Sequence, residues 1–169
     1  KPGETTAIIG STGSGKTALV GLIPRFYDVQ EGEVLVDGVN VKDYDRRTLR
    51  RKIGYVPQKA LLFKGTIMEN IRFGDDSASD ERVKEAAAIA QSTDFIEDKP
   101  DGFDSSISQG GSNVSGGQRQ RLAIARAIVR KPEIYVFDDS FSALDFKTDA
   151  ALRKALADET KNAAVLIIA

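Results

Sequence analysis

The sequence predicts an α/β fold with a parallel sheet, a small antiparallel β piece and a helical insertion between about residues 66 and 130. Three observations support this prediction. Apolar segments of strand length alternate with segments of helical period. One of these strands runs into a glycine-rich loop that opens a helix, and another ends in two consecutive aspartates. Such alternation is typical of an α/β core built on a parallel sheet.

The first part of the chain is expected to supply core strands and the antiparallel piece. Residues 4–9 read as a buried strand, and residues 15–23 as a helix closed by Pro24. Residues 33–41 resemble a hairpin around an Asp-Gly turn, a dipeptide that two-residue hairpin loops favour. A short basic helix is expected over residues 46–51.

The middle of the chain changes from strand to helix. Residues 53–56 read as a strand stopped by Pro57, which leaves Gln58 in a loop. Residues 66–99 are expected to be mostly helical, because a Thr and a Glu at their start have the spacing of a capping box. Residues 101–113 are rich in Gly and Ser and are predicted to be irregular.

The last third returns to alternating strands and helices. Residues 115–118 again have capping-box spacing, ahead of a helix that ends near Pro132. Residues 134–137 read as a short apolar strand, residues 148–160 as a helix and residues 165–168 as a final strand.

Length and composition indicate one domain over residues 1–169. Hydrophobic residues make up 41% of the chain, and no apolar run approaches the roughly 20 residues that cross a bilayer. The chain begins directly at a predicted strand and ends on apolar residues without a turn signal. Both ends therefore look truncated, and we expect a fragment of a larger protein.

Charge and two missing residue types exclude several classes of function. Lys and Arg number 24 against 25 Asp and Glu, so the chain has no bulk attraction for nucleic acid. The absence of Cys excludes thiolate nucleophiles and cysteine-ligated zinc, and the absence of His excludes imidazole-based triads and His-ligated metals. Proton transfer would depend on a carboxylate, Lys, Tyr or water.

The strongest motif is the glycine-rich loop after the first predicted strand. Its glycines let successive backbone N–H groups turn toward one anion, and the helix start adds partial positive charge. Lys16 is predicted to reach the β- and γ-phosphates of ATP, and the Thr17 hydroxyl to bind Mg²⁺. The alternative is an ordinary glycine-rich turn capped by a helix. The motif matches the P-loop pattern and comprises Gly10, Ser11, Thr12, Gly13, Ser14, Gly15, Lys16 and Thr17.

Two aspartates come directly after the apolar strand at residues 134–137, at the strand end where open α/β sheets bind ligands. In P-loop proteins the strand-terminal Asp holds Mg²⁺, so Asp138 is the predicted metal residue. Asp139 is placed to orient or deprotonate an attacking water. The alternative is that both aspartates only end a strand and cap the next segment of the chain.

A third motif consists of Ser115, Gly116, Gly117 and Gln118. It resembles the signature sequence of the ATP-binding cassette (ABC) family, whose ATPase fold has the layout predicted above. A helix start with adjacent glycines lets backbone N–H groups and a Ser hydroxyl approach a phosphate, although a capped helix without a ligand is the alternative. With Gln58 and residues 142–145, the order of motifs resembles that family over essentially the whole chain.

The resemblance implies roles for further residues. Gln58 corresponds to the glutamine that contacts Mg²⁺ and water and links the site to the transport domain, which makes it a candidate catalytic and metal residue beside Lys16. Asp145 corresponds to an aspartate at the interface of two paired domains. In this family the domains pair head to tail, and the signature of one covers the γ-phosphate held by the other. Without the family, Gln58 and Asp145 read as surface polar residues.

The resemblance also implies a cellular role. Residues 61–71 are similar to exporter-type members and would lie near the transmembrane domains, although their apolar side chains suit a core equally well. The implied function is an ATP-hydrolysing module of an exporter at the cytoplasmic face of the cell membrane. A cassette ATPase of soluble machinery, in DNA repair or translation, is the alternative, which the near-neutral charge disfavours. A small-molecule kinase would leave residues 115–118 without a role.

The sequence departs from the family pattern at several positions. Asp139 stands where the family usually has Glu, and a well-placed base contributes about 10²–10⁴-fold to rate. We therefore expect slow hydrolysis here, as in one half of a heterodimeric exporter whose partner supplies the Glu. Val114 replaces the commoner Leu of the signature. The adenine-stacking aromatic and the switch His of the family are both absent, so the chain alone is expected to bind nucleotide weakly.

Overall fold

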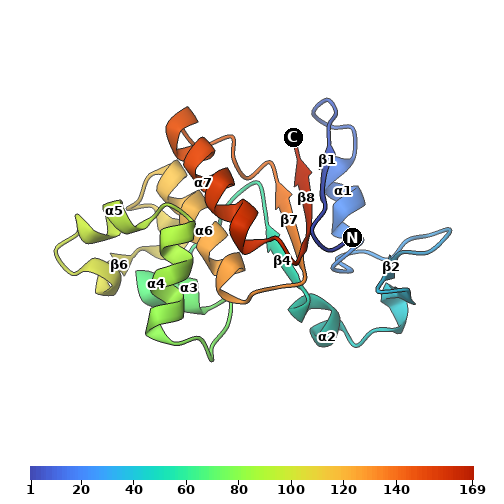
Figure 1. Ribbon diagram of the computed structural model, residues 1–169, viewed down its shortest axis with the longest axis horizontal. Coiled ribbons are helices and arrows are strands. Elements are labelled where there is room, and N and C mark those ends of the chain that lie inside the picture. The colour runs from blue at the N-terminus through green and yellow to red at the C-terminus, as the bar shows by residue number, and fades with distance from the viewer.

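Four apolar segments form a parallel sheet at the centre of the molecule, and the computed structural model describes residues 1–169 (Figure 1). The strand order is β1-β8-β7-β4, and every neighbouring pair is parallel. The α/β fold with a parallel sheet is therefore confirmed. The strands are β1 (Thr5–Ile8), β4 (Ile53–Val56), β7 (Ile134–Asp138) and β8 (Ala164–Ile168).

Helices lie on both sides of this sheet, but in unequal numbers (Figure 1). One side carries two short helices, α1 (Lys16–Gly21) and α2 (Arg46–Arg51). The other side carries α3 (Ile67–Arg72), α4 (Asp80–Ile89), α5 (Thr93–Glu97), α6 (Gly116–Val129) and α7 (Phe146–Glu159). Short 3₁₀ turns occur at Val41–Asp43, Gly102–Asp104 and Gln109–Gly111.

Two capping boxes begin helices of the larger layer. The Glu69 N–H donates to the Thr66 hydroxyl at 3.0 Å, and the Glu69 carboxylate accepts from the Thr66 N–H at 2.7 Å. Ser115 and Gln118 exchange the same pair of bonds, each 3.1 Å long, at the start of α6. These bonds satisfy N–H groups that a helix start otherwise leaves unpaired, which confirms both predicted boxes.

The antiparallel piece is a hairpin of β2 (Leu35–Val36) and β3 (Val39–Asn40). Its turn residues Asp37 and Gly38 have φ angles of 52° and 75°. Positive φ at both central positions gives the twist that joins two antiparallel strands through a two-residue loop. The predicted Asp-Gly turn is therefore confirmed.

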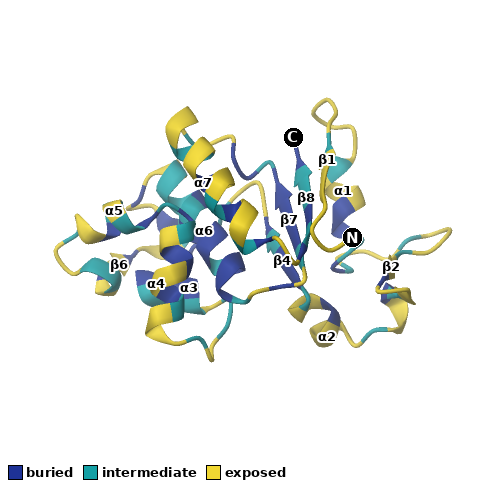
Figure 2. Ribbon diagram, in the orientation of Figure 1, coloured by how far each residue is buried: buried dark blue, intermediate teal, exposed yellow.

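Two expectations about strands were wrong. β1 was expected to be buried, but its first three residues are exposed, because it lies at the sheet edge and pairs only with β8 (Figure 2). Residues 101–113 were expected to be irregular, yet β6 (Ser106–Ile107) pairs antiparallel with β5 (Gly65–Thr66). Ile107 is 2% exposed, so its burial anchors this short pair against the helical layer.

The two faces of the sheet belong to separate hydrophobic cores. The face toward the larger layer joins a cluster of 25 buried residues, which includes Tyr135 and Phe137 of β7. The opposite face joins a cluster of seven, in which Val20 of α1 and Leu49 of α2 pack with Val136. Successive strand residues point to opposite faces, which places alternate β7 side chains in different cores. No helix is both long and apolar enough to cross a bilayer.

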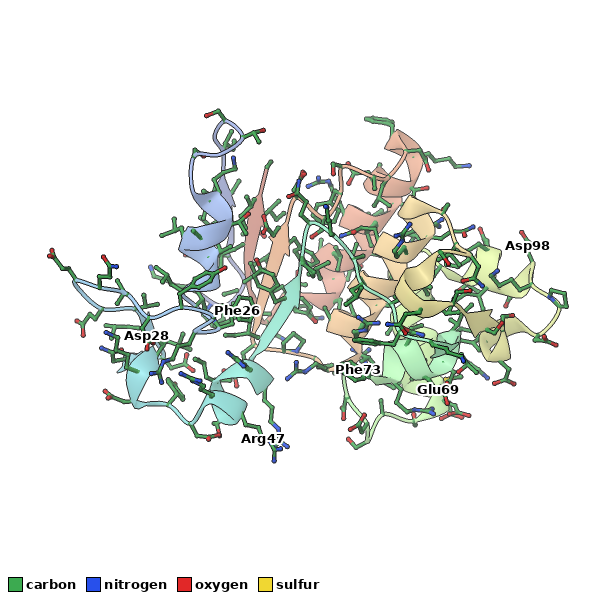
Figure 3. The ribbon with its side chains drawn as sticks, turned by 180° about the vertical axis from the view of Figure 1, so that it is seen from behind. Phe26, Asp28, Arg47, Glu69, Phe73 and Asp98 are labelled. Carbon is green, nitrogen blue, oxygen red and sulfur yellow. The ribbon has the colours of Figure 1, made fainter.

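Arg126 connects α6 to the segment before α4. Its guanidinium donates to the backbone oxygens of Leu61 and Asn70, at 2.8 and 2.9 Å, and lies over the rings of Phe63 and Phe73. Burial lowers the pKa of Arg126 to about 10, which leaves it charged at neutral pH. Figure 3 shows Phe73 on the helical half of the molecule.

Candidate functional site

The glycine-rich loop connects the end of β1 to the start of α1. Gly13 and Gly15 have φ angles of 81° and 88°, a backbone conformation that side chains with a Cβ rarely adopt. A Cβ on either residue would meet no atom within 4 Å. Glycine is therefore needed at these two positions because of the positive φ angle, and a side chain there would not clash with neighbouring atoms.

Lys16 turns back over this loop. Its ammonium donates to the Gly10 carbonyl at 2.5 Å, to the Ser11 carbonyl at 2.9 Å and to the Ser14 hydroxyl at 3.4 Å. These three contacts place a positive charge at the centre of the loop, where backbone N–H groups and the start of α1 also favour an anion.

Asp138 ends β7 beside the first turn of α1. The Thr17 hydroxyl donates to its Oδ1 at 3.1 Å, and the Tyr55 hydroxyl donates to its Oδ2 at 3.1 Å. Asp138 is only 3% exposed and has no Lys or Arg within ion-pair distance. Burial, followed by the charge of Asp138, raises the pKa of Tyr55.

These oxygens suit Mg²⁺. One buried carboxylate and one hydroxyl are hard donors, and Mg²⁺ is commonly held by one or two carboxylates together with substrate phosphates. The chain contains no cluster of three or more acidic side chains that would hold a metal alone. The donor set at Thr17 and Asp138 therefore fits an ion that arrives with a phosphate ligand.

Asp139 is adjacent to this pair but has different partners. Its carboxylate Oδ2 accepts from the Gln58 side-chain amide at 3.0 Å, and its N–H donates to the Ile168 carbonyl at 3.0 Å. Its φ angle of 47° lies in the left-handed region. The side-chain hydrogen bond of Gln58 to an aspartate therefore goes to Asp139 in this structure.

A cavity of about 550 Å³ collects most of the predicted residues. It brings together the glycine-rich loop, Gln58 and both aspartates. Ser11 is the one loop residue that does not line it. Tyr27, which was not predicted, contributes to the wall. The lining residues are Gly10, Thr12, Gly13, Ser14, Gly15, Lys16, Thr17, Ala18, Tyr27, Gln58, Asp138, Asp139, Ile168 and Ala169.

Residues 115–118 and Asp145 lie outside this cavity. Asp145 caps α7, where its carboxylate accepts from the Thr148 N–H at 2.9 Å and from the Thr148 hydroxyl at 2.7 Å. The bond from the Thr148 hydroxyl, followed by that from its N–H, lowers the pKa of Asp145. A Cβ on Gly117 would lie 3.1 Å from the Ala143 carbonyl, so the start of α6 and the segment before α7 are neighbours.

A comparison with models of protein families identifies the family to which this chain belongs. The model of the family described as ABC transporter matches residues 1–142, which is most of the chain. The chain belongs to the ABC transporter family. It is therefore an ABC-type ATP-binding domain, and its fold is the ABC ATPase fold.

Proteins with similar sequences are also named as ATP-binding proteins of transporters. An uncharacterized ABC transporter ATP-binding protein of Mycobacterium tuberculosis is 49% identical over 171 residues, which cover 99% of this chain and 29% of that protein. A putative multidrug export ATP-binding/permease protein of Staphylococcus aureus is 45% identical over 167 residues, with the same shares covered. This chain thus spans less than a third of the length of these relatives.

A solved structure also matches. The structure of a bacterial Atm1-family ABC exporter with ATP bound superposes on this ABC domain with a TM-score of 0.96 and 39% sequence identity. The match covers 99% of this chain and 30% of that chain.

Proposed function

We propose that this ABC domain binds Mg·ATP and hydrolyses it to drive a membrane exporter. The observation that carries the proposal is the buried carboxylate of Asp138, held beside Thr17 at the wall of the glycine-loop cavity. A carboxylate this buried is costly unless it is paired, and a metal ion that bridges it to phosphate is a suitable partner.

Each part of the cavity has a role in binding. The N–H groups of residues 10–17 hold the phosphates, and Lys16 moves from the loop oxygens to the β- and γ-phosphates. The Thr17 hydroxyl and the Asp138 carboxylate hold Mg²⁺, with Gln58 contributing once nucleotide is present. Mg²⁺ held by these residues would supply positive charge beside the phosphate oxygens.

Hydrolysis depends on Asp139. Its carboxylate orients or deprotonates the attacking water, and the 3.0 Å bond from Gln58 holds that carboxylate in place. Asp is one methylene shorter than Glu, so the carboxylate stays near Gln58 and reaches less far toward the phosphates. In the complete protein we expect tight binding of ATP and slow turnover at this site.

A second nucleotide-binding domain, homologous or identical, completes the site head to tail. The tip formed by residues 115–118 closes over the γ-phosphate of the partner, and Asp145 lies at the same interface. Ser115, Gly116 and Asp145 are exposed, and Phe146 is 90% exposed, which supports a surface that a partner covers. The backbone of Gly117 lies close to the Ala143 carbonyl, so the two proposed interface segments are neighbours on the surface.

The exporter assignment rests on the relatives and on one exposed surface. Leu61 is 55% exposed on the segment 61–71 that the transmembrane domains are expected to meet, and Phe73, two residues beyond that segment, is 62% exposed. The Staphylococcus aureus relative is named for multidrug export and combines ATP-binding and permease parts. We therefore place this domain at the cytoplasmic face of the cell membrane, and we prefer an exporter to soluble DNA-repair or translation machinery.

Substitution of Lys16 tests the proposed nucleotide binding. In the complete protein, Lys16→Ala should weaken Mg·ATP binding at least tenfold by calorimetry, because the cationic partner of the phosphates is lost. Lys84→Ala is the matched control, since Lys84 is an exposed lysine on α4 away from the cavity. Equal affinity in the two variants would refute the proposal. Radiolabelled ATP should yield only inorganic phosphate, whereas a phosphorylated acceptor would indicate a kinase.

A further inference from the structure

Tyr55 gives the buried aspartate its second hydrogen bond. Its hydroxyl donates to Asp138 Oδ2 at 3.1 Å, while the Thr17 hydroxyl donates to Oδ1 at 3.1 Å. Each carboxylate oxygen therefore has one neutral donor from a different element. Two donors on opposite oxygens restrict the rotation of a carboxylate about its Cβ–Cγ bond more tightly than one donor does.

Strand register explains why Tyr55 reaches this position. Tyr55 of β4 is paired with Val136 of β7, and Asp138 lies two residues beyond Val136. Residues two apart on a strand share a face, so Tyr55, Val136 and Asp138 all project toward α1. The long tyrosine side chain spans the remaining distance along the strand.

The ring of Tyr55 is itself held in place. Phe26 meets it edge to face, with ring centroids 5.2 Å apart and an interplanar angle of 76°. The guanidinium of Arg50 lies 5.5 Å from the Phe26 centroid and donates to the Pro24 carbonyl at 3.0 Å. Figure 3 shows Phe26 below α1, beside the central sheet. This packing restrains the Tyr55 ring and therefore the position of its hydroxyl.

We propose that Tyr55 is a positioning residue for the metal ion: its hydroxyl turns the Asp138 carboxylate so that Oδ1 and the Thr17 oxygen face the same ion. This inference rests on the proposed function of the cavity. Partners that orient a metal-ligating carboxylate typically change metal affinity about 10–100-fold when they are removed. A purely structural tyrosine would contribute only its ring to the smaller core.

The substitution Tyr55→Phe separates these two roles, because it keeps the ring and removes the hydroxyl. We would measure Mn²⁺ binding to the ATP-loaded complete protein by electron paramagnetic resonance, with Mn²⁺ as the probe for Mg²⁺. Tyr55→Phe should weaken Mn²⁺ binding about tenfold. Its affinity for ATP in EDTA should match that of the wild type, because the loop contacts do not involve Tyr55.

Tyr135→Phe is the matched control. Tyr135 lies on the adjacent strand but belongs to the opposite core, and its ring stacks on Phe137 at 5.9 Å. Removing its hydroxyl should leave Mn²⁺ binding unchanged. In an Asp138→Ala background, Tyr55→Phe should cause no further loss of Mn²⁺ affinity, since no carboxylate remains to be oriented.

Three results would overturn the inference. Unchanged Mn²⁺ affinity in Tyr55→Phe, with Lys16→Ala still defective in ATP binding, would remove the positioning role and leave the proposed function standing. An equal loss of Mn²⁺ affinity with and without Asp138 would assign the effect to packing. Failure of the wild-type protein to bind ATP would overturn both proposals.

Discussion

At the scale of single residues, Asp139 combines an unfavourable backbone with a candidate catalytic side chain. A φ angle of 47° is uncommon for residues other than Gly, and Asp and Asn tolerate it better than most. Its short carboxylate also accepts the amide of Gln58. The backbone conformation at this position therefore favours the shorter side chain, whereas reach toward a water favours Glu.

The substitution Asp139→Glu should accordingly have two opposite effects. Turnover in the assembled transporter should rise, because the longer carboxylate reaches the attacking water. The thermal unfolding midpoint should fall, by an amount equivalent to about 1 kcal/mol, since Glu is less suited to the left-handed region. Phosphate release and thermal melting measure the two effects.

Asp139→Asn provides the comparison. It keeps the backbone tolerance but removes the base, so hydrolysis should be lost with little change in stability. If Asp139→Glu leaves phosphate release unchanged, the shorter side chain is not what limits this site.

The residues of the candidate site were predictable only where a motif names them. The glycine-rich loop, Gln58, Asp138 and Asp139 occur at recognisable spacings, and the structure places them around one cavity. Tyr27 and Tyr55 were not predicted as site residues. An aromatic residue in an apolar stretch is most often part of a core, and only strand register shows that the hydroxyl of Tyr55 reaches a carboxylate.

At the scale of elements, one glycine allows the segment after α3 to contact the end of α6. A Cβ on Gly74 would overlap the Arg126 carbonyl oxygen and lie 2.8 Å from Val129 Cγ1. The first of these atoms is backbone and has no rotamer to relieve the overlap. The two helices therefore depend on a residue without a side chain for their close approach.

Gly74→Ala should destabilise the domain by roughly 3 kcal/mol, because α3 and α6 must separate to admit one methyl group. Chemical denaturation measures the change in the free energy of unfolding. Gly116→Ala is the matched control, since a Cβ there would meet no atom within 4 Å. Equal stability of the two variants would show that the segment relaxes without cost.

Elements with caps and several turns were predictable from sequence, and very short ones were not. The helix expected over residues 148–160 is observed as α7, Phe146–Glu159, with Asp145 as its cap. The pair β5 and β6 has two residues in each strand, too few for a period to be detected. The exposure of β1 was also missed, because an apolar stretch is the same on an edge strand as on a buried one.

At the scale of the whole molecule, the sheet separates two hydrophobic cores of different size. The core toward α3–α7 contains 25 buried residues, and the core toward α1 and α2 contains seven. Hydrophobic burial is the main favourable term in folding, so local opening should be easier on the smaller side. The glycine-rich loop and Thr17 belong to that side.

Amide hydrogen exchange should show this difference. Amides of α1 and of the hairpin β2–β3 should exchange at least tenfold faster than those of α6, whose buried side chains belong to the larger core. Mg·ATP should slow exchange in α1 more than in α6, because the first turn of α1 lines the proposed nucleotide cavity. Uniform protection across the sheet would contradict the division into two cores.

The continuity of α6 connects two distant surfaces of the domain. The helix runs without a break from its capped start at Ser115 to Arg126. The Arg126 guanidinium donates hydrogen bonds to the backbone carbonyls of Leu61 and Asn70. Its 14 residues span roughly 21 Å, at about 1.5 Å per residue. Under the proposed pairing of two domains, a displacement of residues 115–118 should therefore also move Arg126 and the rings of Phe63 and Phe73, because the helix between them is unbroken.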